Sequence, residues 1–299
     1  MFFIIPVGVE YRAQRYPVVT FTLIGINTVV YLISLFVDWG ARGDPDTLTW
    51  WEQTFWLIPQ HSHWYAYFTS LFVHAGFFHL LGNLIYLFLF GSCVEDIIGR
   101  WRYVIFYLLG GLAADFAYIG FNPEHFSSEI PMGGASGAVF TCMGGFVLLL
   151  PKRRVEFKYF LWLVFRAWSN EFFLPAWLVM SFWFLQDLFF AVLSYLAKHT
   201  GGGVAFGAHV GGFAGGLLMI LAYKVVSQRH ELKQEKLEEQ ARIANQRLVY
   251  LYEGGSQAGP FTVRQVKQML QLGSVGQDAL YWSEGMPDWR PVLELVPQR

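Results

Sequence analysis

Long apolar runs separated by short polar connections occupy most of the chain. A membrane-spanning helix needs about 20 mostly apolar residues in succession. Six stretches reach or approach this length, and the fourth of them is short and continues a Gly/Ala-rich segment. They are Val18–Val37, Phe77–Val94, Tyr103–Gly120, Ser136–Leu150, Leu174–Leu193 and Val204–Val226. The pattern therefore predicts six transmembrane helices.

One further apolar stretch, residues 155–175, does not fit a spanning helix. Lys158, Arg166 and Pro175 interrupt it, and charged side chains inside a lipid-exposed helix are costly. We interpret this segment as interfacial or re-entrant rather than as a seventh span.

The pattern changes after the sixth apolar stretch. Residues 227–247 carry charges of both signs and favour a helix, which predicts a solvated helix or a stiff linker. Residues 248–299 hold short aromatic strands around one amphipathic helix at Val263–Leu272, followed by Gly273 as a helix stop. We therefore expect three parts: an all-α polytopic six-helix membrane domain over residues 1–226, this charged helical linker, and a small soluble α+β domain at the C-terminal end.

Composition supports a membrane protein. Charged residues make up 14% of the chain, against about 25% in typical soluble domains. The formal net charge of −1 gives no indication of nucleic-acid binding. Cys93 and Cys142 both lie in apolar runs, so the sequence offers neither a disulfide framework nor a CxxC metal site. The first residues lack the order of a signal peptide, so membrane entry is expected to depend on internal helices.

The basic residues fall in alternate connections. Arg and Lys gather before the first apolar stretch, between the second and third, between the fourth and fifth, and after the sixth. The intervening connections carry only Arg42 and Lys198. Because basic residues accumulate on the cytoplasmic side of a membrane, we expect both termini in the cytoplasm.

Polar side chains on three predicted helices share one depth. With the termini inside, Ser136, His209 and the pair His79 and Asn83 lie near the outer ends of their helices, with His74 close by. His79 and Asn83 are four residues apart and share a helix face. A single intramembrane serine is more often a packing residue bonded to a carbonyl, and a single histidine is more often structural. Convergence at one depth favours a functional site, because polar groups are costly in lipid.

Small residues offer a way to bring two of these helices together. The sixth stretch carries one row of glycines at four-residue spacing and a second row beside it: Gly207, Gly211 and Gly215, with Gly212 and Gly216. The segment 134–145 is also rich in Gly and Ala. Helices with such faces approach closely in lipid. Their packing is expected to bring His209 within hydrogen-bond reach of Ser136.

The expected chemistry is nucleophilic. A serine hydroxyl becomes a strong nucleophile when an adjacent base removes its proton, and His209 is the imidazole placed to do so for Ser136. Charge that develops on an attacked carbonyl oxygen needs hydrogen-bond donors in a dry site. The backbone N–H of Ser136 and the side chains of His79 and Asn83 are the available donors.

The site is expected to be a Ser–His dyad rather than a triad. Asp115 and Asp187 lie elsewhere along their predicted helices, so no carboxylate is evident at the depth of His209. Phe140 stands one turn after Ser136 on the same face. We expect it to lie against the imidazole ring and to hold the ring by packing, in place of the missing acid.

Other chemistries match less well. The GxSxG turn of soluble hydrolases fails at Ala138, and no HExxH zinc motif is present. A transporter built on Asp115 and Asp187 lacks an evident inverted repeat. A metal cluster is an alternative for four histidines, His61, His63, His74 and His79. They lack Cys or Glu at ligand spacing, so no metal or cofactor is expected.

Three motifs in a fixed order carry a resemblance to a known family. "HAGFFHLLGN", "GGASGAVF" and "GAHVGGFAGG", together with "VED" at 94–96, resemble the rhomboid family of intramembrane serine proteases. The resemblance covers about residues 1–226. It implies a six-helix bundle with Ser136 as the nucleophile and His209 as the general base.

The same resemblance assigns further roles at the site. It implies an oxyanion site formed by His79, Asn83 and the backbone of Ser136. It also implies that Gly134 lines the site and that His74 is a structural residue of the second helix.

The resemblance further implies a class of substrate and a location. The substrates would be single transmembrane segments, cut near their outer ends where helix-breaking residues let the strand unwind. The membrane would be the bacterial inner membrane, because no organelle-targeting segment is evident. One departure is Ala66 in "HWYAYFTSLFVHAG", where many members have Trp-Arg. The alternative is a non-catalytic binder of transmembrane clients, although its usual mark is a lost serine or histidine.

The C-terminal part resembles a second family. "GPFTVRQVKQML" and "LYWSEGMPDWRPV" are similar to GYF-type domains, whose members bind proline-rich peptides on an aromatic face. Aromatic grooves bind such peptides because the free peptide is already extended. The alternative is that most of these aromatic side chains form the core of a tiny domain. The residues considered are Tyr250, Tyr252, Phe261, Tyr281, Trp282 and Trp289, with Gly259 and Pro260 beside Phe261.

Overall fold

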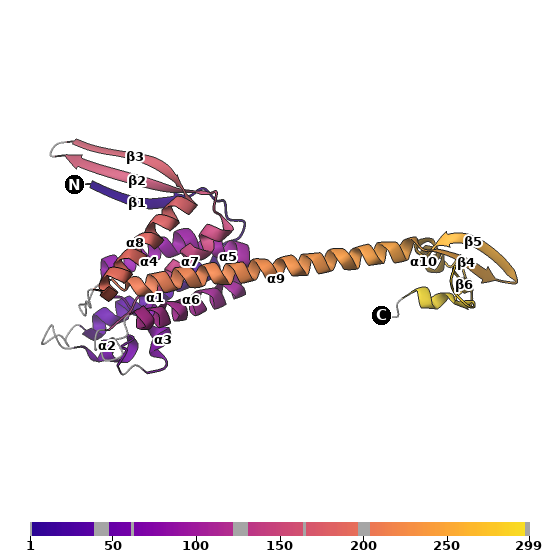
Figure 1. The fold of residues 1–299 in the computed structure, drawn as a ribbon, viewed down its shortest axis with the longest axis horizontal. Helices are drawn as coiled ribbons and strands as arrows, with labels where there is room; N and C mark the ends of the chain where they lie inside the picture. The colour runs from indigo at the N-terminus through magenta and orange to yellow at the C-terminus, as the bar shows by residue number, and fades with distance from the viewer. Residues whose placement is uncertain are drawn as a thin grey trace. The chain divides into compact units, whose positions relative to one another are not determined.

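A computed structural model describes most of the chain, namely residues 2–38, 48–60, 63–121, 131–163, 166–196 and 204–296. The chain divides into two compact units, Met1–Tyr223 and Lys224–Arg299. The first unit holds the apolar helices and a three-stranded sheet, and the second holds a small α+β domain (Figure 1). Arg42, His61 and Lys198, which entered the sequence-based predictions, lie outside the described residues.

All six predicted apolar stretches fold as helices, and the structure is mostly helical as predicted. Among the described residues, five helices are long and apolar enough to cross a membrane, and a sixth, of 14 residues, is shorter. The helices of the first unit are α1 (Val18–Asp38), α2 (Trp50–Phe55), α3 (Ala66–Thr69), η1 (Ser70–Phe72), α4 (Phe77–Tyr86), η2 (Leu87–Gly91), α5 (Ser92–Ile98), α6 (Arg100–Phe121), α7 (Ser136–Leu149), α8 (Ala176–Leu196) and α9 (Phe206–Gln246). The π-helical η2 joins α4 to α5, so these three form one apolar span.

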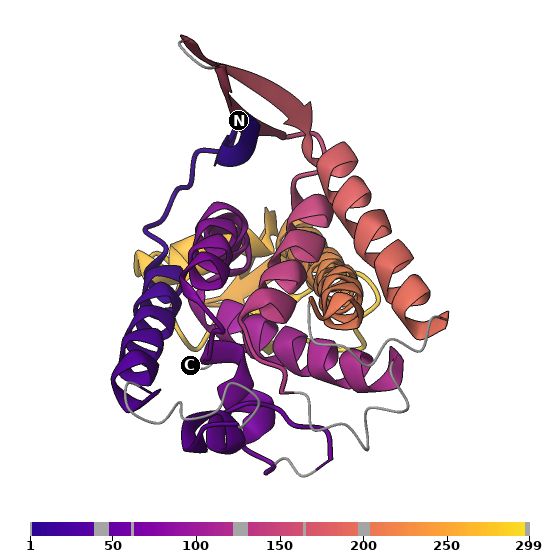
Figure 2. The same cartoon turned by 90° about the vertical axis from the view of Figure 1, so that its left-hand side faces the viewer.

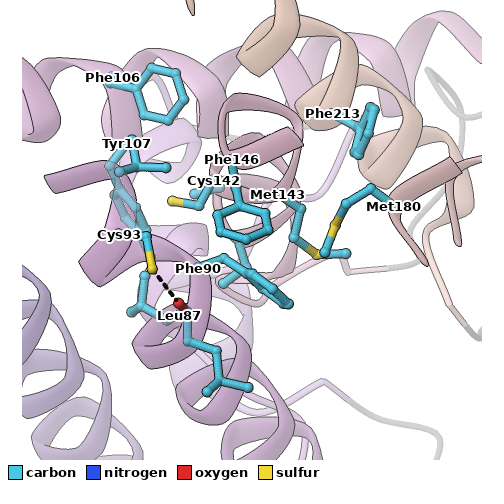
Figure 3. Close-up of a cluster of buried hydrophobic side chains, with 14 of the residues drawn as sticks. Leu87, Phe90, Cys93, Phe106, Tyr107, Cys142, Met143, Phe146, Met180 and Phe213 are labelled. Atoms are coloured by element: carbon cyan, nitrogen blue, oxygen red, sulfur yellow. Dashed lines mark hydrogen bonds between the residues drawn. The ribbon is translucent and has the colours of Figure 1, made fainter. Parts of the chain in front are cut away.

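Helix α7 lies among the other helices of the first unit (Figure 2). Most of its side chains are buried. Figure 3 shows the apolar cluster around it, in which Phe146 of α7 meets Phe90 of η2 with ring centroids 5.0 Å apart. Met180 of α8 and Phe213 of α9 belong to the same cluster. The first turn of α7, which carries Ser136, is therefore part of a helix held by packing on several sides.

The stretch interpreted as interfacial or re-entrant is a β-hairpin. Its strands are β2 (Arg154–Leu163) and β3 (Arg166–Pro175), and β1 (Phe2–Val9) pairs with β2 to complete an antiparallel sheet in the order β1-β2-β3. The ring of Phe157 contacts the rings of Phe172 and Trp183, which packs the base of the sheet against α8. These strands were not predicted, although Val155, Phe157 and Tyr159 alternate with Glu156 and Lys158 as in a strand with one buried face.

Two buried carboxylates tie the N-terminal segment to α5. Glu95, 2% exposed, accepts hydrogen bonds from the backbone N–H groups of Val19 at 2.9 Å and Thr20 at 2.8 Å, at the start of α1. The first turn of a helix leaves such donors without a helical partner. Asp96 accepts from the Tyr11 hydroxyl at 2.6 Å and from two backbone N–H groups just after it. Burial and the neighbouring Asp96 raise the pKa of Tyr11, so the phenol remains a hydrogen-bond donor at neutral pH.

The second unit starts within α9. The residues predicted as a charged helical linker continue this helix to Gln246. The elements that follow are β4 (Leu248–Glu253), β5 (Ser256–Thr262), α10 (Val263–Gln271), β6 (Leu280–Trp282), β7 (Arg290–Pro291) and η4 (Val292–Leu295). The sheet has the order β5-β4-β6-β7 and packs on α10 over a small apolar core.

Helix α10 follows its sequence signals closely. Thr262 and Gln265 form a capping box at its N-terminal end. Gly273, the predicted stop, follows two residues after the helix with φ of 70°. A left-handed residue after the last turn is the usual way for a helix to end, and glycine adopts it without strain.

Candidate active site

A glycine with positive φ shapes the loop before Ser136. Gly134 has φ of 135°, a region that residues with a Cβ rarely adopt, and its N–H donates to the Ser70 carbonyl at 2.8 Å. A Cβ placed on Gly134 would lie 2.7 Å from the Cε1 atom of His79. Glycine is therefore required at this position for two reasons, backbone conformation and space, and the second of them puts His79 against the loop.

Asn83 lies on the same side of the loop as His79. The same Cβ position on Gly134 is 2.9 Å from His79 Nε2 and 3.7 Å from Asn83 Nδ2. Asn83 is buried, and its Nδ2 group finds no acceptor within the described part of the chain. A buried donor without a partner calls for an explanation. An oxygen of a bound substrate is the kind of acceptor that fits.

His74 takes a different place from the one predicted. It lies in the loop ahead of α4 and not on the helix, so the prediction of a helical residue was wrong. Its Nε2 accepts a long hydrogen bond of 3.4 Å from the N–H of Ala135, and its ring centroid is 5.1 Å from that of His79. His74 is buried, does not line the cavity described below, and contacts the loop before Ser136 through this hydrogen bond.

Two rows of glycines on α9 face two different helices. A Cβ on Gly212 would overlap the Gly137 carbonyl of α7, and one on Gly216 would overlap the Thr141 carbonyl of the same helix. The row that the spacing singled out packs elsewhere: Gly207, Gly211 and Gly215 meet Phe121, Ala117 and Ala113 of α6. Close packing of α7 against α9 is therefore present, but the second row of glycines produces it.

His209 lies flat against Phe140. The two ring centroids are 4.1 Å apart and the ring planes differ by 8°, which confirms the predicted contact. Phe140 stands one turn after Ser136 on α7. Ser136 and His209 both line one cavity. No hydrogen bond joins them within the described residues, so the predicted Ser136–His209 hydrogen bond stays a prediction.

The prediction that no carboxylate lies beside His209 was wrong. Asp187 Oδ2 of α8 is 2.9 Å from His209 Nδ1, and the two side chains are 7% and 12% exposed. Asp187 lies nine residues from the end of α8 at Leu196, whereas His209 lies three residues after the start of α9 at Phe206. On the predicted spans, Asp187 lies six residues before the outer end at Leu193, and His209 lies five residues after the outer end at Val204. The predicted spans therefore already placed the two side chains at similar depth, and the prediction overlooked this.

A single cavity of about 880 Å³ collects these groups. Its lining includes nearly all of the predicted site residues of the first unit, and His74, which lies behind the loop, is not among them. The lining also includes Asp187 and a second buried acid, Asp115 of α6. The residues from the predictions that line it are Ser136, His209, His79, Asn83, Gly134 and Phe140. Among the residues that the structure describes, no group of three or more His, Cys, Asp or Glu side chains is placed to hold a metal ion.

The second unit presents a separate aromatic surface. Tyr250 pairs with Trp282 across β4 and β6, with ring centroids 6.0 Å apart. Tyr252, two residues along β4 and 43% exposed, lies on the same face, with its ring centroid 5.7 Å from that of Trp289. Successive residues of a strand point to opposite faces, so the sheet separates these aromatic rings from its core.

Not every aromatic considered for this surface belongs to it. Tyr281 is buried, and Phe261 packs against the same core. Gly259 and Pro260 are exposed on β5. The indole N–H of Trp282 donates to the Met286 carbonyl at 2.9 Å, which fixes the ring of this half-buried residue. We define the aromatic surface as Tyr250, Tyr252, Trp282 and Trp289.

Two family models match parts of the chain. Residues 61–225, more than half of the chain, match the family model of the rhomboid domain. The chain belongs to the rhomboid family. Its long apolar helices make this rhomboid an integral membrane protein. Residues 250–295 match the family model of GYF domain 2, which confirms the second resemblance.

Several bacterial relatives of this rhomboid are named as proteases. The chain is 27% identical over 141 residues to the rhomboid protease GluP of Bacillus subtilis, covering 47% of this chain and 26% of that protein. It is 29% identical over 187 residues to the rhomboid protease GlpG of Klebsiella pneumoniae, covering 62% and 58%. The putative rhomboid protease YdcA of Bacillus subtilis is 28% identical over 137 residues, covering 46% and 64%. The chain therefore spans between about a quarter and two thirds of the length of these relatives.

Proposed function

We propose that this rhomboid is an intramembrane serine endopeptidase that cleaves transmembrane segments of other membrane proteins. One observation carries the proposal: His209 is stacked on Phe140, one turn from Ser136, in one cavity with Asn83, whose Nδ2 group has no acceptor among the residues that the structure describes. Relatives of similar sequence are named rhomboid proteases. Both the serine and the histidine that a non-catalytic relative would lack are present.

The proposed reaction starts with Ser136. Its Oγ attacks the carbonyl carbon of the scissile bond while His209 accepts the hydroxyl proton. His209 then gives this proton to the nitrogen of the leaving strand, and the carbon–nitrogen bond breaks. An acyl ester on Ser136 remains. Water attacks this ester with His209 again accepting a proton, and the serine is restored when that proton returns to its oxygen.

The oxyanion in this proposal lies near the loop before Ser136. Donors that are fixed before the reaction stabilise the developing negative charge without reorganisation. The Nδ2 group of Asn83 and the ring of His79 lie against this loop at Gly134, and the Ser136 N–H stands at the start of α7. Together they form the proposed oxyanion site.

The proposed substrates are single transmembrane segments that enter the cavity from the bilayer. The proposed location is a bacterial inner membrane with both termini in the cytoplasm, because basic residues gather in the connections on that side. Cleavage is expected near the outer end of the substrate helix, where helix-breaking residues expose the backbone.

A fluorophosphonate probe separates the peptidase from a non-catalytic binder. The probe is expected to modify Ser136 in purified protein, because the serine oxygen attacks phosphorus as it would attack a carbonyl. Labelling should vanish in Ser136→Ala and slow by at least about 10²-fold in His209→Ala. In-gel fluorescence and mass spectrometry of the modified peptide measure it. Absence of labelling in folded native protein would support the non-catalytic alternative.

We propose that the second unit binds proline-rich peptides on its aromatic surface. The shared exposed face of Tyr250, Tyr252 and Trp282 supports this role, since extended proline-rich segments bind between aromatic rings.

Trp282→Ala is expected to weaken binding of a fluorescent proline-rich decapeptide by at least about tenfold, as loss of a central aromatic anchor does. Fluorescence anisotropy of the full chain in detergent measures the dissociation constant. Leu272→Ala, a change at an exposed residue after α10, should leave it unchanged. Equal binding by native protein and Trp282→Ala contradicts the assignment.

A further inference from the structure

The contact between Asp187 and His209 joins two helices across the cavity. Oδ2 and Nδ1 are 2.9 Å apart, and both side chains are nearly buried. A buried carboxylate is stable only when it is paired or hydrogen-bonded. The hydrogen bond to His209 therefore explains how the Asp187 carboxylate can be buried. The same hydrogen bond also affects the imidazole.

A carboxylate at Nδ1 selects one form of the ring. An ionised carboxylate is only an acceptor, so Nδ1 must carry a proton and donate it. The other ring nitrogen, Nε2, is then the one with a free lone pair in the neutral ring. A general base must present this lone pair to the nucleophile.

Two contacts together fix the ring of His209. Stacking on Phe140 sets the plane of the ring, with centroids 4.1 Å apart, but leaves the ring free to turn within that plane. The hydrogen bond to Asp187 sets the direction within the plane. With Nδ1 held by α8, Nε2 is on the far side of the ring from Asp187.

We propose that Asp187 is a positioning residue that holds His209 in the Nδ1-protonated form, so that Nε2 is the atom that accepts the Ser136 proton. The inference rests on the proposed peptidase function and extends it from a dyad to a triad in the chain order Ser136, Asp187, His209. In this proposal Asp187 acts through His209 and not on the substrate or the nucleophile. It acts by orienting the ring and by stabilising the imidazolium that forms when Ser136 loses its proton.

Kinetics of Asp187 variants test the proposal. Asp187→Ala is expected to lower kcat for a transmembrane reporter by about 10⁴-fold with KM changed by less than about twofold, because the ring form and not the substrate contact is altered. Asp187→Asn, which keeps the shape, should also lower kcat by about 10⁴-fold, since its amide can donate to Nδ1 and so stabilise the wrong ring form. The midpoints of thermal unfolding should match that of native protein.

A matched control is available on β3. Glu171 also pairs with a basic side chain at 2.9 Å, Lys158 on β2, but the pair is exposed and remote from His209. Glu171→Gln is the same kind of change and should leave kcat and KM unaltered. Nitrogen-15 NMR of histidine-labelled protein gives a second measurement: the His209 signals, assigned with His209→Ala, should show a protonated Nδ1 in native protein and a changed ring form in Asp187→Ala.

The outcomes separate this inference from the proposed function. Native kcat in Asp187→Ala, or an unchanged ring form, overturns the positioning role while leaving the peptidase in place if Ser136→Ala is inactive. A joint change of kcat, KM and unfolding midpoint shows a structural ion pair only and also overturns the role. Full cleavage by Ser136→Ala shows that the proposed function itself has failed.

Discussion

Ser136→Ala is expected to reduce cleavage of a transmembrane reporter to the uncatalysed background, and His209→Ala to reduce kcat by at least about 10³-fold. Without the hydroxyl no acyl ester can form, and without the imidazole the hydroxyl keeps its proton. The two residues act as a unit, so the double variant should be no slower than either single variant. Reporter cleavage in detergent and in vesicles, with product masses determined, measures the effect.

Matched controls come from the same types of residue elsewhere in the chain. Ser92→Ala removes an exposed hydroxyl that bonds to its own helix at the Phe88 carbonyl. His230→Ala removes an exposed imidazole on α9, the helix that carries His209. Both variants should cleave at the native rate. Equal cleavage by native protein and Ser136→Ala would contradict the proposed role of Ser136 as the nucleophile. The non-catalytic binder would then be the favoured alternative.

Sequence patterns located the helices of the site and most of its side chains. The apolar runs are long, and in lipid a run of that length is expected to form a helix, because every backbone polar group must be hydrogen-bonded within the protein. The contact of Phe140 with His209 followed from helical spacing and a single assumption, that α7 and α9 pack closely. The facing of His79 and Asn83 toward one loop followed from their spacing on α4.

The features that were not predicted from the sequence depend on contacts between elements that are far apart in the chain. Asp187 was excluded although the predicted spans place it and His209 at similar depth, six residues before Leu193 and five residues after Val204. Depth alone does not show which neighbouring helix faces the imidazole. In the hairpin β2–β3, the alternation of Val155, Phe157 and Tyr159 with charged residues was overlooked. Strand β1 was missed because its partner lies far along the chain. Tertiary pairing over such distances leaves no local signal. In the second unit, by contrast, the cap and stop of α10 are local signals.

The glycines of α9 show a second limit of prediction from sequence. Their four-residue spacing predicted a close helix contact, and two contacts exist. Neighbouring positions on a helix point about 100° apart, so the row that includes Gly211 contacts α6 and the row that includes Gly212 contacts α7. Spacing alone cannot say which row meets which helix. The row at Gly212 is the one on which the distance between Ser136 and His209 depends, because it meets α7 at Gly137, the residue after Ser136.

Gly212→Ala is therefore expected to damage both stability and catalysis. The added Cβ would overlap the carbonyl of Gly137, a backbone group that cannot swing aside as a flexible side chain can. Overpacking of this kind costs about 1–3 kcal/mol, and a backbone contact favours the upper end. A shift of about 1 Å between a nucleophile and its base can cost about 10²-fold in rate. Thermal unfolding in detergent and reporter cleavage measure the two effects.

Gly25→Ala is the control for this change. Gly25 lies in α1 with no heavy atom within 4 Å of the position that a Cβ would take, and alanine favours a helix over glycine by about 1 kcal/mol. It should melt at or slightly above the native temperature and cleave at the native rate. If Gly212→Ala behaves like Gly25→Ala, then α7 and α9 are farther apart than the structure places them. Without that close contact, α7 and α9 would lose the packing that places the Phe140 ring against His209, one turn from Ser136.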